Sequence, residues 1–340
     1  MPVKLINPNN IPEVLARACQ VDRHVSYGDI SVTRFIDAPQ ITHLLAHNTV
    51  EVDVADRLLM ILGTGVHHVV DRAEVAHASA RELLDAAAVL ERLGGEKHLK
   101  AAKYLMEEAK LRFPDAFDDS VITEKTLTIS IDTEIGSLEL SGTFDKYWVE
   151  LKKLEDYKVT SVWGYLYEES KKKWYAQLNV YAYMLREHGY EVDEAIITAI
   201  FRDWKAIEKA RNKDYPPQLA MEIDIPLYSQ EKMKKYMTKR AELHLRAMSG
   251  DVVDCTPKEM WASNDVFKIK TPGRSKSIKN FTIESKADEF MDLNELKYVG
   301  MYKEFHPGER KRCERFCSVA SVCPQHQKFL DLKEKLETEK

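Results

Sequence analysis

Two acidic residues and a lysine in the middle of the chain have the types and spacing that phosphodiester hydrolysis requires. Asp145 ends one stretch of alternating polar and apolar residues, and Asp156 and Lys158 stand two apart on the next. Because side chains alternate between the faces of a strand, Asp156 and Lys158 should leave the same face. The acids could hold one or two Mg²⁺ ions, which neutralise a phosphate and lower the pKa of a bound water, and the lysine could orient that water. Taken alone, the Asp-Tyr-Lys run is also typical of a half-exposed strand with alternating charges.

Other polar side chains occur at spacings that suit the same chemistry. His67 lies in a helical stretch and could be another metal ligand through its neutral imidazole, whereas His68 points about 100° away around the helix. Gln177 and Tyr181 stand four residues apart on a later helix and therefore share one face. Each also has an ordinary interpretation: a lone helical histidine is usually structural or at the surface, and the later pair could be the polar edge of a core helix.

Two glutamates near these residues fit the pattern less well. Strand alternation turns Glu155 to the face opposite Asp156, so we leave it outside the candidate site. Glu124 could approach from the preceding strand, but nothing in its spacing demands it.

The elements that must position these residues change from helix to strand along the chain. The first 45 residues predict short helical or irregular pieces, and residues 54–112 repeat apolar residues three and four apart, as amphipathic helices do. Gly94-Gly95 divides that region into at least two helices. Residues 126–149 alternate polar with apolar side chains around Gly136, which predicts two or three antiparallel strands.

Strands and helices then alternate as far as residue 248. A strand over residues 154–159 carries the second acid and the lysine, and a helix ending at Gly189 follows it. Residues 195–204 are almost continuously apolar, as in a strand buried on both faces. A further strand over 218–227 and a long polar helix over 229–248 come next.

Four short motifs connect these elements in a fixed order: G-x-x-x-H, G-x-x-D, D-x-K and Q-x-x-x-Y. They are matched by Gly63 to His67, Gly142 to Asp145, Asp156 to Lys158, and Gln177 to Tyr181. The order and spacing resemble the RecB-like branch of the PD-(D/E)XK nucleases, over roughly residues 30–205. The resemblance implies an α/β fold with a restriction-endonuclease-like core, in which helices flank a mixed central sheet. It also implies a deoxyribonuclease that depends on Mg²⁺ or Mn²⁺.

The same resemblance implies a role for each matching residue. The metal would be bound by His67, Asp145, Asp156 and the backbone carbonyl of Tyr157, Lys158 would be catalytic together with the two acids, and Gln177 and Tyr181 would touch the DNA strand. The first acid of the D-x-K motif is aspartate where some branches have glutamate, a change that the family tolerates.

Three cysteines near the C-terminus, Cys313, Cys317 and Cys323, lie within eleven residues. The N-terminus has no secretory pattern, and in a reducing compartment such a group favours metal binding over disulfides. A closed tetrahedral site or a cubane cluster needs a fourth ligand. The candidates are Cys255 first, and then Cys19 and His326; Cys19 could equally be a small apolar residue on a helix face.

Some RecB-like nucleases, including the AddB subunit and CRISPR-associated spacer-processing nucleases, bind an iron–sulfur cluster with one distant and three grouped cysteines. The cluster here looks similar, but its first gap is C-x3-C, and Asp37-Ala38-Pro39 stands where the distant cysteine would be. We therefore keep iron–sulfur, Zn²⁺ and no metal open, with a structural role in either metal-bound case. Phage-encoded recombination or replication exonucleases have a similar ending, RC-x2-(F/Y)C…CPQ.

Basic residues indicate where DNA could lie. The segment KIKTPGRSKSIK is a predicted phosphate-contacting loop that contains Lys268, Lys270, Arg274, Lys276 and Lys279. The run 171–173 with Trp174 could contact the DNA backbone or stack on a base. Both runs could equally be solvated faces, and neither has a recognisable base-reading element.

The whole chain of 340 residues carries 50 basic and 55 acidic side chains, a net charge of −5. This balance excludes a globally basic nucleic-acid coat but not a nuclease, because carboxylates that hold metal ions add negative charge. No apolar run is long enough to span a membrane, so we expect a cytoplasmic protein, or one in the host cytoplasm if it is phage-encoded. The expected parts are an N-terminal helical region with the metal histidine (1–115), an α/β core (116–250) and a C-terminal extension with the cysteines (251–340).

The sequence thus predicts an exonuclease that acts on DNA in recombination, repair or replication, with possible partner proteins from those processes and without a membrane partner. The helical N-terminal region could restrict access to a strand end, which favours an exonuclease. Two alternatives stay open: a catalytically idle protein that binds DNA or organises a complex, and a restriction-type endonuclease.

Overall fold

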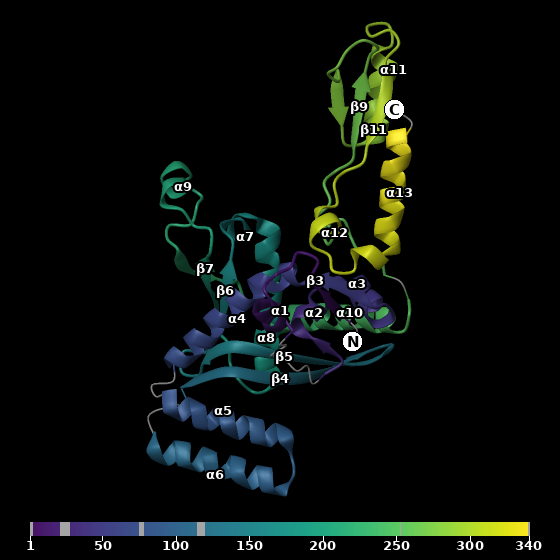
Figure 1. The fold of residues 1–340 in the computed structure, drawn as a ribbon. Helices are drawn as coiled ribbons and strands as arrows, with labels where there is room; N and C mark the ends of the chain where they lie inside the picture. Colours follow the sequence, from purple (N-terminus) through teal and green to yellow (C-terminus); the bar gives the residue numbers. More distant parts are fainter. Residues whose placement is uncertain (1–2, 21–27, 75–77, 114–119, 252, 339–340) are drawn as a thin grey trace. The chain divides into compact units, whose positions relative to one another are not determined.

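A computed structural model describes residues 3–20, 28–74, 78–113, 120–251 and 253–338 (Figure 1). The chain divides into two compact units. The sheet unit comprises the described parts of residues 5–36 and 53–242, and the cysteine unit those of residues 1–4, 37–52 and 243–340. The three consecutive parts expected from the sequence therefore differ from this division, since residues 37–52 group with the C-terminal residues.

The sheet unit is built on a mixed six-stranded sheet, as the sequence predicts for an α/β fold. Its strand order is β2-β5-β6-β7-β8, and β4 also pairs with β5. The strands are β2 (Ile30–Ser31), β4 (Val121–Thr133), β5 (Gly136–Trp148), β6 (Lys153–Thr160), β7 (Glu194–Phe201) and β8 (Ala220–Asp224). β6 and β7 run parallel, and so do β2 and β5, whereas the pairs β4–β5, β5–β6 and β7–β8 are antiparallel.

Helices flank this sheet. They are α1 (Glu13–Ala18), α2 (Val32–Phe35), α4 (Val54–Glu74), α5 (Ala78–Leu93), α6 (Glu96–Arg112), α7 (Val162–Leu166), α8 (Glu168–Glu187), α9 (Ala206–Arg211) and α10 (Gln230–Met248), of which the last residues of α10 belong to the cysteine unit. α8 packs on β4, β6 and β7 with fully buried residues such as Leu178 and Leu185, and α4 packs on β6. Gly94 and Gly95 have positive φ angles between α5 and α6, as the break in the helical pattern predicts.

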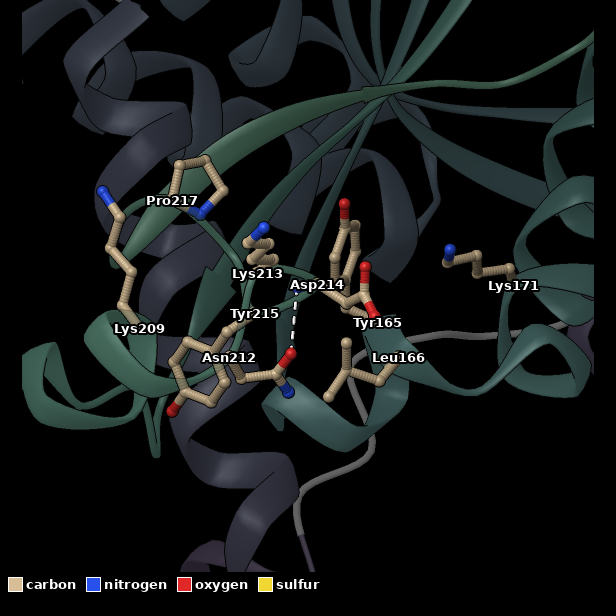
Figure 2. A pocket seen from close by; sticks show the side chains of 9 residues that line it. All are labelled: Tyr165, Leu166, Lys171, Lys209, Asn212, Lys213, Asp214, Tyr215 and Pro217. Carbon is tan, nitrogen blue, oxygen red and sulfur yellow. Dashed lines mark hydrogen bonds between the residues drawn. The ribbon is translucent and has the colours of Figure 1, made fainter.

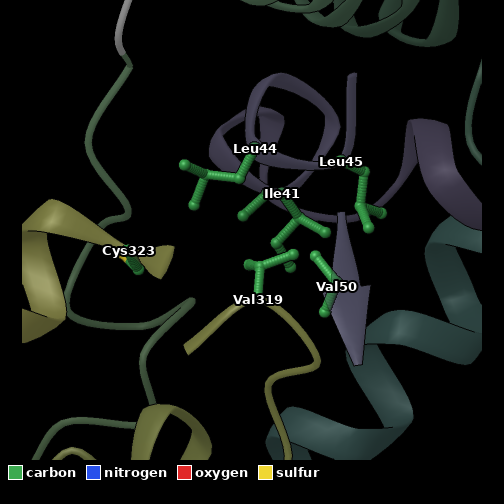
Figure 3. Close-up of a cluster of buried hydrophobic side chains, with 7 residues drawn as sticks. Ile41, Leu44, Leu45, Val50, Val319 and Cys323 are labelled. Carbon is green, nitrogen blue, oxygen red and sulfur yellow. The ribbon is translucent and has the colours of Figure 1, made fainter. Parts of the chain in front are cut away.

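The cysteine unit combines short helices with a small antiparallel sheet of order β10-β9-β11. Its elements are α3 (Pro39–His47), β9 (Val266–Lys270), β10 (Lys279–Phe281), α11 (Glu284–Asn294), β11 (Tyr302–His306), α12 (Lys311–Arg315), the 3₁₀ helix η2 (Ala320–Val322) and α13 (Pro324–Thr338). β1 (Val3–Ile6) and β3 (Val50–Asp53), which pair with each other, lie at the division between the units. Figure 3 shows the apolar core, in which Ile41 and Leu44 of α3 meet Val50, Val319 and Cys323.

None of the helices in the described residues has the length and apolar character needed to cross a lipid bilayer.

Candidate active site

The candidate site lies where strands β5 and β6 stop pairing. Their antiparallel ladder ends at Lys146 and Glu155. The adjoining residue of β5, Asp145, turns its carboxylate toward β6, and its Oδ2 accepts a 2.7 Å hydrogen bond from the backbone N–H of Tyr157. A side-chain oxygen thus satisfies an N–H group that faces the opening, and the two strands separate where both acidic residues lie.

Helix α4 brings His67 to this opening. Its Nε2 lies 3.0 Å from the carbonyl oxygen of Tyr157, and its Nδ1 lies 3.5 Å from Oδ1 of Asp145. The hydrogen bond with Asp145 raises the pKa of His67, although burial lowers it. An imidazole, a backbone carbonyl and a carboxylate therefore converge on one small volume. His68 is exposed, as its position around the helix predicts.

A second carboxylate, that of Glu124, joins this group. Single ligand atoms of His67, Glu124 and Asp145 all lie within 4.8 Å of one another. The hairpin register sets residue 124 opposite residue 145, because the pairs on both sides of it follow the same sequence of partners. Glu124 has a φ of 49°, a left-handed conformation that is uncommon in residues other than glycine and often occurs at functional sites.

The sequence interpretation left Glu124 undecided, although one signal could have placed it. β4 and β5 are joined by the two-residue turn 134–135, with Thr133 paired to Gly136. A two-residue turn fixes every pair along a hairpin, including the pairing of positions 124 and 145. Gly136 alone marked the turn in the sequence, without its length.

Asp156 and Lys158 share one face of β6, as strand alternation predicts. Lys158 Nζ lies 2.6 Å from Oδ2 of Asp156. Asp156 is only 3% exposed, and burial raises its pKa to about 6, while the charge of Lys158 opposes that rise. The nearby charge of Asp145 raises the pKa of Asp156 further. The carboxylate of Asp145 is therefore close enough to influence the ionisation of Asp156.

Gln177 and Tyr181 of α8 face the acids from the next layer. Gln177 Nε2 donates to Oδ1 of Asp156 at 3.4 Å. Tyr181 is 5% exposed, and burial, followed by the charge of Asp156, raises the pKa of its phenol. Gly142 makes room for this tyrosine, since a Cβ atom there would stand 2.8 Å from Tyr181 Cε1. A DNA contact by Gln177 and Tyr181 stays a prediction.

Glu155 points to the other face of β6, which confirms its exclusion from the site. Its carboxylate accepts hydrogen bonds from Trp148 Nε1 at 3.0 Å and from Thr198 Oγ1 at 2.6 Å. Lys146 Nζ lies 3.9 Å away. These contacts give this buried acid a structural role.

The donor set of the site fits a hard divalent cation. Two carboxylates and a carbonyl oxygen lie around one imidazole, and Mg²⁺ and Mn²⁺ prefer oxygen-rich sites of this kind. Oδ2 of Asp156 is buried, and beyond its ion pair with Lys158 no hydrogen-bond donor in the described chain meets it in good geometry. A buried carboxylate oxygen in that position is suited to a cation. The expected ligands His67 and Asp145 are brought together, Glu124 joins them, and Asp156 is held by Lys158.

The four candidate cysteines gather in the cysteine unit. Burial raises the pKa of the Cys255 thiol to about 12, and negative charge on Cys323, Cys313 or Cys317 would raise it further. Gln325 ties Cys255 in place, because its side chain accepts from the Cys255 N–H and donates to the Cys255 carbonyl, both at 2.9 Å. Cys255, the first choice for a fourth ligand, therefore lies with the other three.

Of the other two candidates for a fourth ligand, Cys19 lies in the other unit, and His326 lies in the cysteine unit but packs against an aromatic ring. Cys19 is buried in the sheet unit beside Ala16 and Val54, as expected for a small apolar residue. His326 is buried in the cysteine unit and stacks on Phe329, with ring centroids 6.4 Å apart. Burial lowers its pKa.

An ion pair holds Asp37, which stands where the resemblance would place a distant cysteine. Arg312 Nη2 lies 2.6 Å from both carboxylate oxygens of Asp37. Arg312 directly precedes Cys313, and Ala38 is fully buried in the same cluster as Cys323. A charged pair thus joins these two segments of the chain beside the cysteines.

The basic segment of the cysteine unit is a strand and turn, which corrects the expectation of a loop. Lys268 and Lys270 lie on β9, and Lys279 begins β10. Lys270 Nζ lies 2.5 Å from Glu304 on the neighbouring strand. The expected stacking of Trp174 on a base does not fit either, since Trp174 is buried at 9% exposure in α8. Arg274 and Lys276 lie in the turn between β9 and β10. DNA binding by the five basic residues of this segment stays a prediction.

The fold and the site define a mixed α/β protein with helices around a mixed sheet and a cluster of acids, a lysine and a histidine at one opening of that sheet. No protein-family model and no curated protein matches the sequence. The solved structure of the protein SSO0001 is similar at 15% identity over 71% of this chain and 87% of that one, with a TM-score of 0.32. A phage-related exonuclease from Haemophilus somnus 129PT is similar at 14% identity over 62% of this chain and 92% of that one, with a TM-score of 0.25. We therefore base the function on the side chains of the site.

Proposed function

We propose that this chain is a metal-dependent deoxyribonuclease of the PD-(D/E)XK type. The observation that carries the proposal is the convergence of His67, Glu124 and Asp145 within 4.8 Å, beside the buried pair of Asp156 and Lys158. Structural ion pairs seldom need a histidine and a strained glutamate as well. Metal-assisted phosphodiester hydrolysis can use all of these groups: the acids and the imidazole as ligands of the cation, and the lysine to orient the attacking water.

Each side chain has a distinct task in this proposal. His67, Glu124, Asp145, Asp156 and the Tyr157 carbonyl would hold Mg²⁺ or Mn²⁺, which supplies charge neutralisation and an acidified water when bound. The ammonium group of Lys158, held by Asp156, would contact the scissile phosphate and orient the attacking water. Gln177 keeps the Asp156 carboxylate in place through its hydrogen bond.

The release of acid-soluble nucleotides from linear DNA tests whether the chain is a nuclease or a catalytically idle protein. We expect Mg²⁺- or Mn²⁺-dependent degradation by the native chain and a loss of roughly a hundredfold or more in Lys158→Gln. Lys153→Gln, at the other end of the same strand, should keep full activity. If Lys158→Gln leaves the rate unchanged, or the native chain binds DNA and never cleaves it, the proposal is wrong.

A comparison of linear DNA with covalently closed plasmid shows whether the chain cleaves as an exonuclease or as an endonuclease. We infer an exonuclease that acts in recombination, repair or replication, because α4, α5 and α6 form a helical region next to the sheet in sequence and could restrict access to strand ends. Linear DNA should shorten progressively, while covalently closed plasmid should persist. Discrete fragments from the plasmid would instead indicate a restriction-type endonuclease.

We also propose that the four cysteines bind an iron–sulfur cluster with a structural role. Tetrahedral zinc, with Zn–S bonds of about 2.3 Å, needs its sulfurs roughly 3.8 Å apart. No three of the four sulfurs, all within the described chain, meet within 4.8 Å. Cysteine thiolates are the ligands of iron–sulfur clusters, and all four of these thiols lie in the cysteine unit. Anaerobically purified protein should be brown and contain iron and sulfide, whereas stoichiometric zinc without iron would refute the assignment.

A further inference from the structure

A cavity of about 860 Å³ in the sheet unit lies beside the ends of β6 and β7 (Figure 2). These parallel strands end at the paired residues Thr160 and Phe201. The chain leaving β6 forms α7, and the chain leaving β7 forms α9 and the turn after it. The cavity walls therefore start from neighbouring strand ends. Lys158 stands two residues before Thr160, roughly 7 Å along the strand.

The cavity is lined by cations from three different segments. Lys171 lies in the first turn of α8, Lys209 lies in α9, and Lys213 lies in the turn before β8. In Figure 2 these side chains surround the same space. Among the lining residues whose side chains the structure describes, Asp214 is the only acidic one.

The connection between β7 and β8 is locally basic in a chain of net charge −5. Residues 202–214 contain five basic and three acidic side chains, so that 5 − 3 gives +2. Two of the acids are engaged: Asp203 accepts from the Val162 N–H at 2.7 Å, and Glu208 lies 3.9 Å from Arg211. The charge that remains is complementary to a phosphate backbone.

Aromatic rings accompany these cations. Trp163 of α7 and Tyr167, the residue directly after this helix, form what we call the α7 ring pair. They are 61% and 59% exposed, and their ring centroids are 5.7 Å apart. Tyr165 and Tyr215 line the cavity itself, and Lys171 Nζ lies 4.7 Å from the centroid of the Tyr165 ring. Large exposed rings beside lysines provide stacking surfaces for unpaired bases and contacts for their phosphates.

We propose that this cavity and the α7 ring pair bind single-stranded DNA and lead it to the candidate active site. The proposal rests on the nuclease function above and adds the form of its substrate. Bases within a duplex stack on one another and do not offer their faces to side chains, whereas single strands do. The exposed rings follow the end of β6, the β-strand that carries Lys158, and they therefore favour single-stranded DNA as the substrate.

Fluorescence anisotropy of a labelled oligothymidylate, measured in EDTA so that no cleavage occurs, tests the proposal. The double variant Trp163→Ala/Tyr167→Ala should bind about tenfold more weakly. The double variant Lys209→Gln/Lys213→Gln should flatten the dependence of log K on log salt by roughly 0.7 for each lysine. Controls are Lys234→Gln/Lys239→Gln on α10 and Tyr104→Ala on α6, which remove comparable exposed groups from the same unit and should leave binding unchanged.

Parallel assays separate this proposal from the nuclease assignment. Degradation of linear DNA by the native chain reports the nuclease function, whatever the effect of the two double variants on DNA binding. Unchanged oligothymidylate binding in both double variants would overturn the proposal. An equal loss of duplex and single-strand binding would also overturn it. A selective loss of single-strand binding, with native circular dichroism, would support it.

Discussion

At the scale of single residues, the site depends on the ionisation of a buried acid. Burial places the pKa of Asp156 at about 6, so that near neutral pH the carboxylate is charged and can hold a cation beside Lys158. Desolvation, which favours the neutral acid, is opposed by the lysine. Residues of this kind are frequent at reacting centres, because an acid close to its pKa changes state easily.

Metal affinity should consequently depend on pH. As the pH falls below about 6, Asp156 takes up a proton that must leave before a cation binds, so Mn²⁺ affinity should fall by roughly tenfold per pH unit. His67, whose pKa is also raised, should make the fall steeper. Electron paramagnetic resonance of free Mn²⁺ across this range measures the effect. Asp156→Asn should bind weakly and lose its share of the pH dependence, and a flat native profile would contradict the prediction.

Glu124 should matter as much as the acids that the motifs identify. Glu124→Gln removes one carboxylate charge from the group formed with His67 and Asp145, and we expect Mn²⁺ affinity to fall roughly tenfold or more. Isothermal titration calorimetry measures this change directly. Glu134→Gln, at the turn of the same hairpin, is the matched control, and equal affinities in the two variants would refute a ligand role for Glu124.

At the scale of elements, glycines show which parts of the motifs serve packing. In α4, a Cβ atom at Gly63 or at Gly65 would meet nothing within 4 Å, so neither glycine is needed for space. Gly63 stands one turn before His67 on the same helix face, whereas Gly65 points elsewhere. Open space above the histidine suits the approach of a substrate.

Alanine at these two positions should therefore separate stability from activity. Both Gly63→Ala and Gly65→Ala should stabilise the protein by about 0.5–1 kcal/mol in thermal unfolding, because alanine favours the helix. Only Gly63→Ala should slow DNA degradation if substrate passes over this turn. Equal activity in the two variants would show that Gly63 has no role in substrate access.

Alanine at Gly142 should destabilise the protein, in contrast to alanine at Gly63 or Gly65. A Cβ atom there would stand 2.5 Å from Val32 Cγ2 and 2.8 Å from Tyr181 Cε1, so Gly142→Ala overpacks α2 and α8 against β5. We expect a loss of about 1–3 kcal/mol in urea unfolding. A stability equal to that of the native chain would mean that the Tyr181 ring moves aside freely.

The sequence predicted the individual helices and strands better than it predicted how the strands pair with one another. The β4–β5 hairpin, β6, β7 and the break at Gly94 follow from local patterns of polarity and from glycine, which do not depend on distant residues. The position of Glu124 depends on the hairpin register, and the strand at Lys268 depends on pairing with β11. Neither leaves a local signal.

At the scale of the whole molecule, the division into two units also depends on contacts between residues that are far apart in sequence, so local patterns could not predict it. Residues 37–52 join the C-terminal residues through contacts such as Ile41 with Val319 and Asp37 with Arg312. The latter pair is 275 residues apart in sequence, and no periodic pattern announces such a contact. Cys255 likewise reaches the C-terminal cysteines through a distant partner, Gln325.

The pair of Asp37 and Arg312 should stabilise the cysteine unit whether or not a cluster is bound. Arg312→Gln leaves a carboxylate that is 25% exposed without its partner, and we expect a loss of roughly 2 kcal/mol, less than for a fully buried pair. Hydrogen exchange of α12 and α13 measures the loss, and a double-mutant cycle with Asp37→Asn isolates the interaction. Lys333→Gln breaks the more exposed pair with Glu314, and should cost under about 1 kcal/mol. A coupling energy near zero would mean that apolar packing alone joins residues 37–52 to the cysteines.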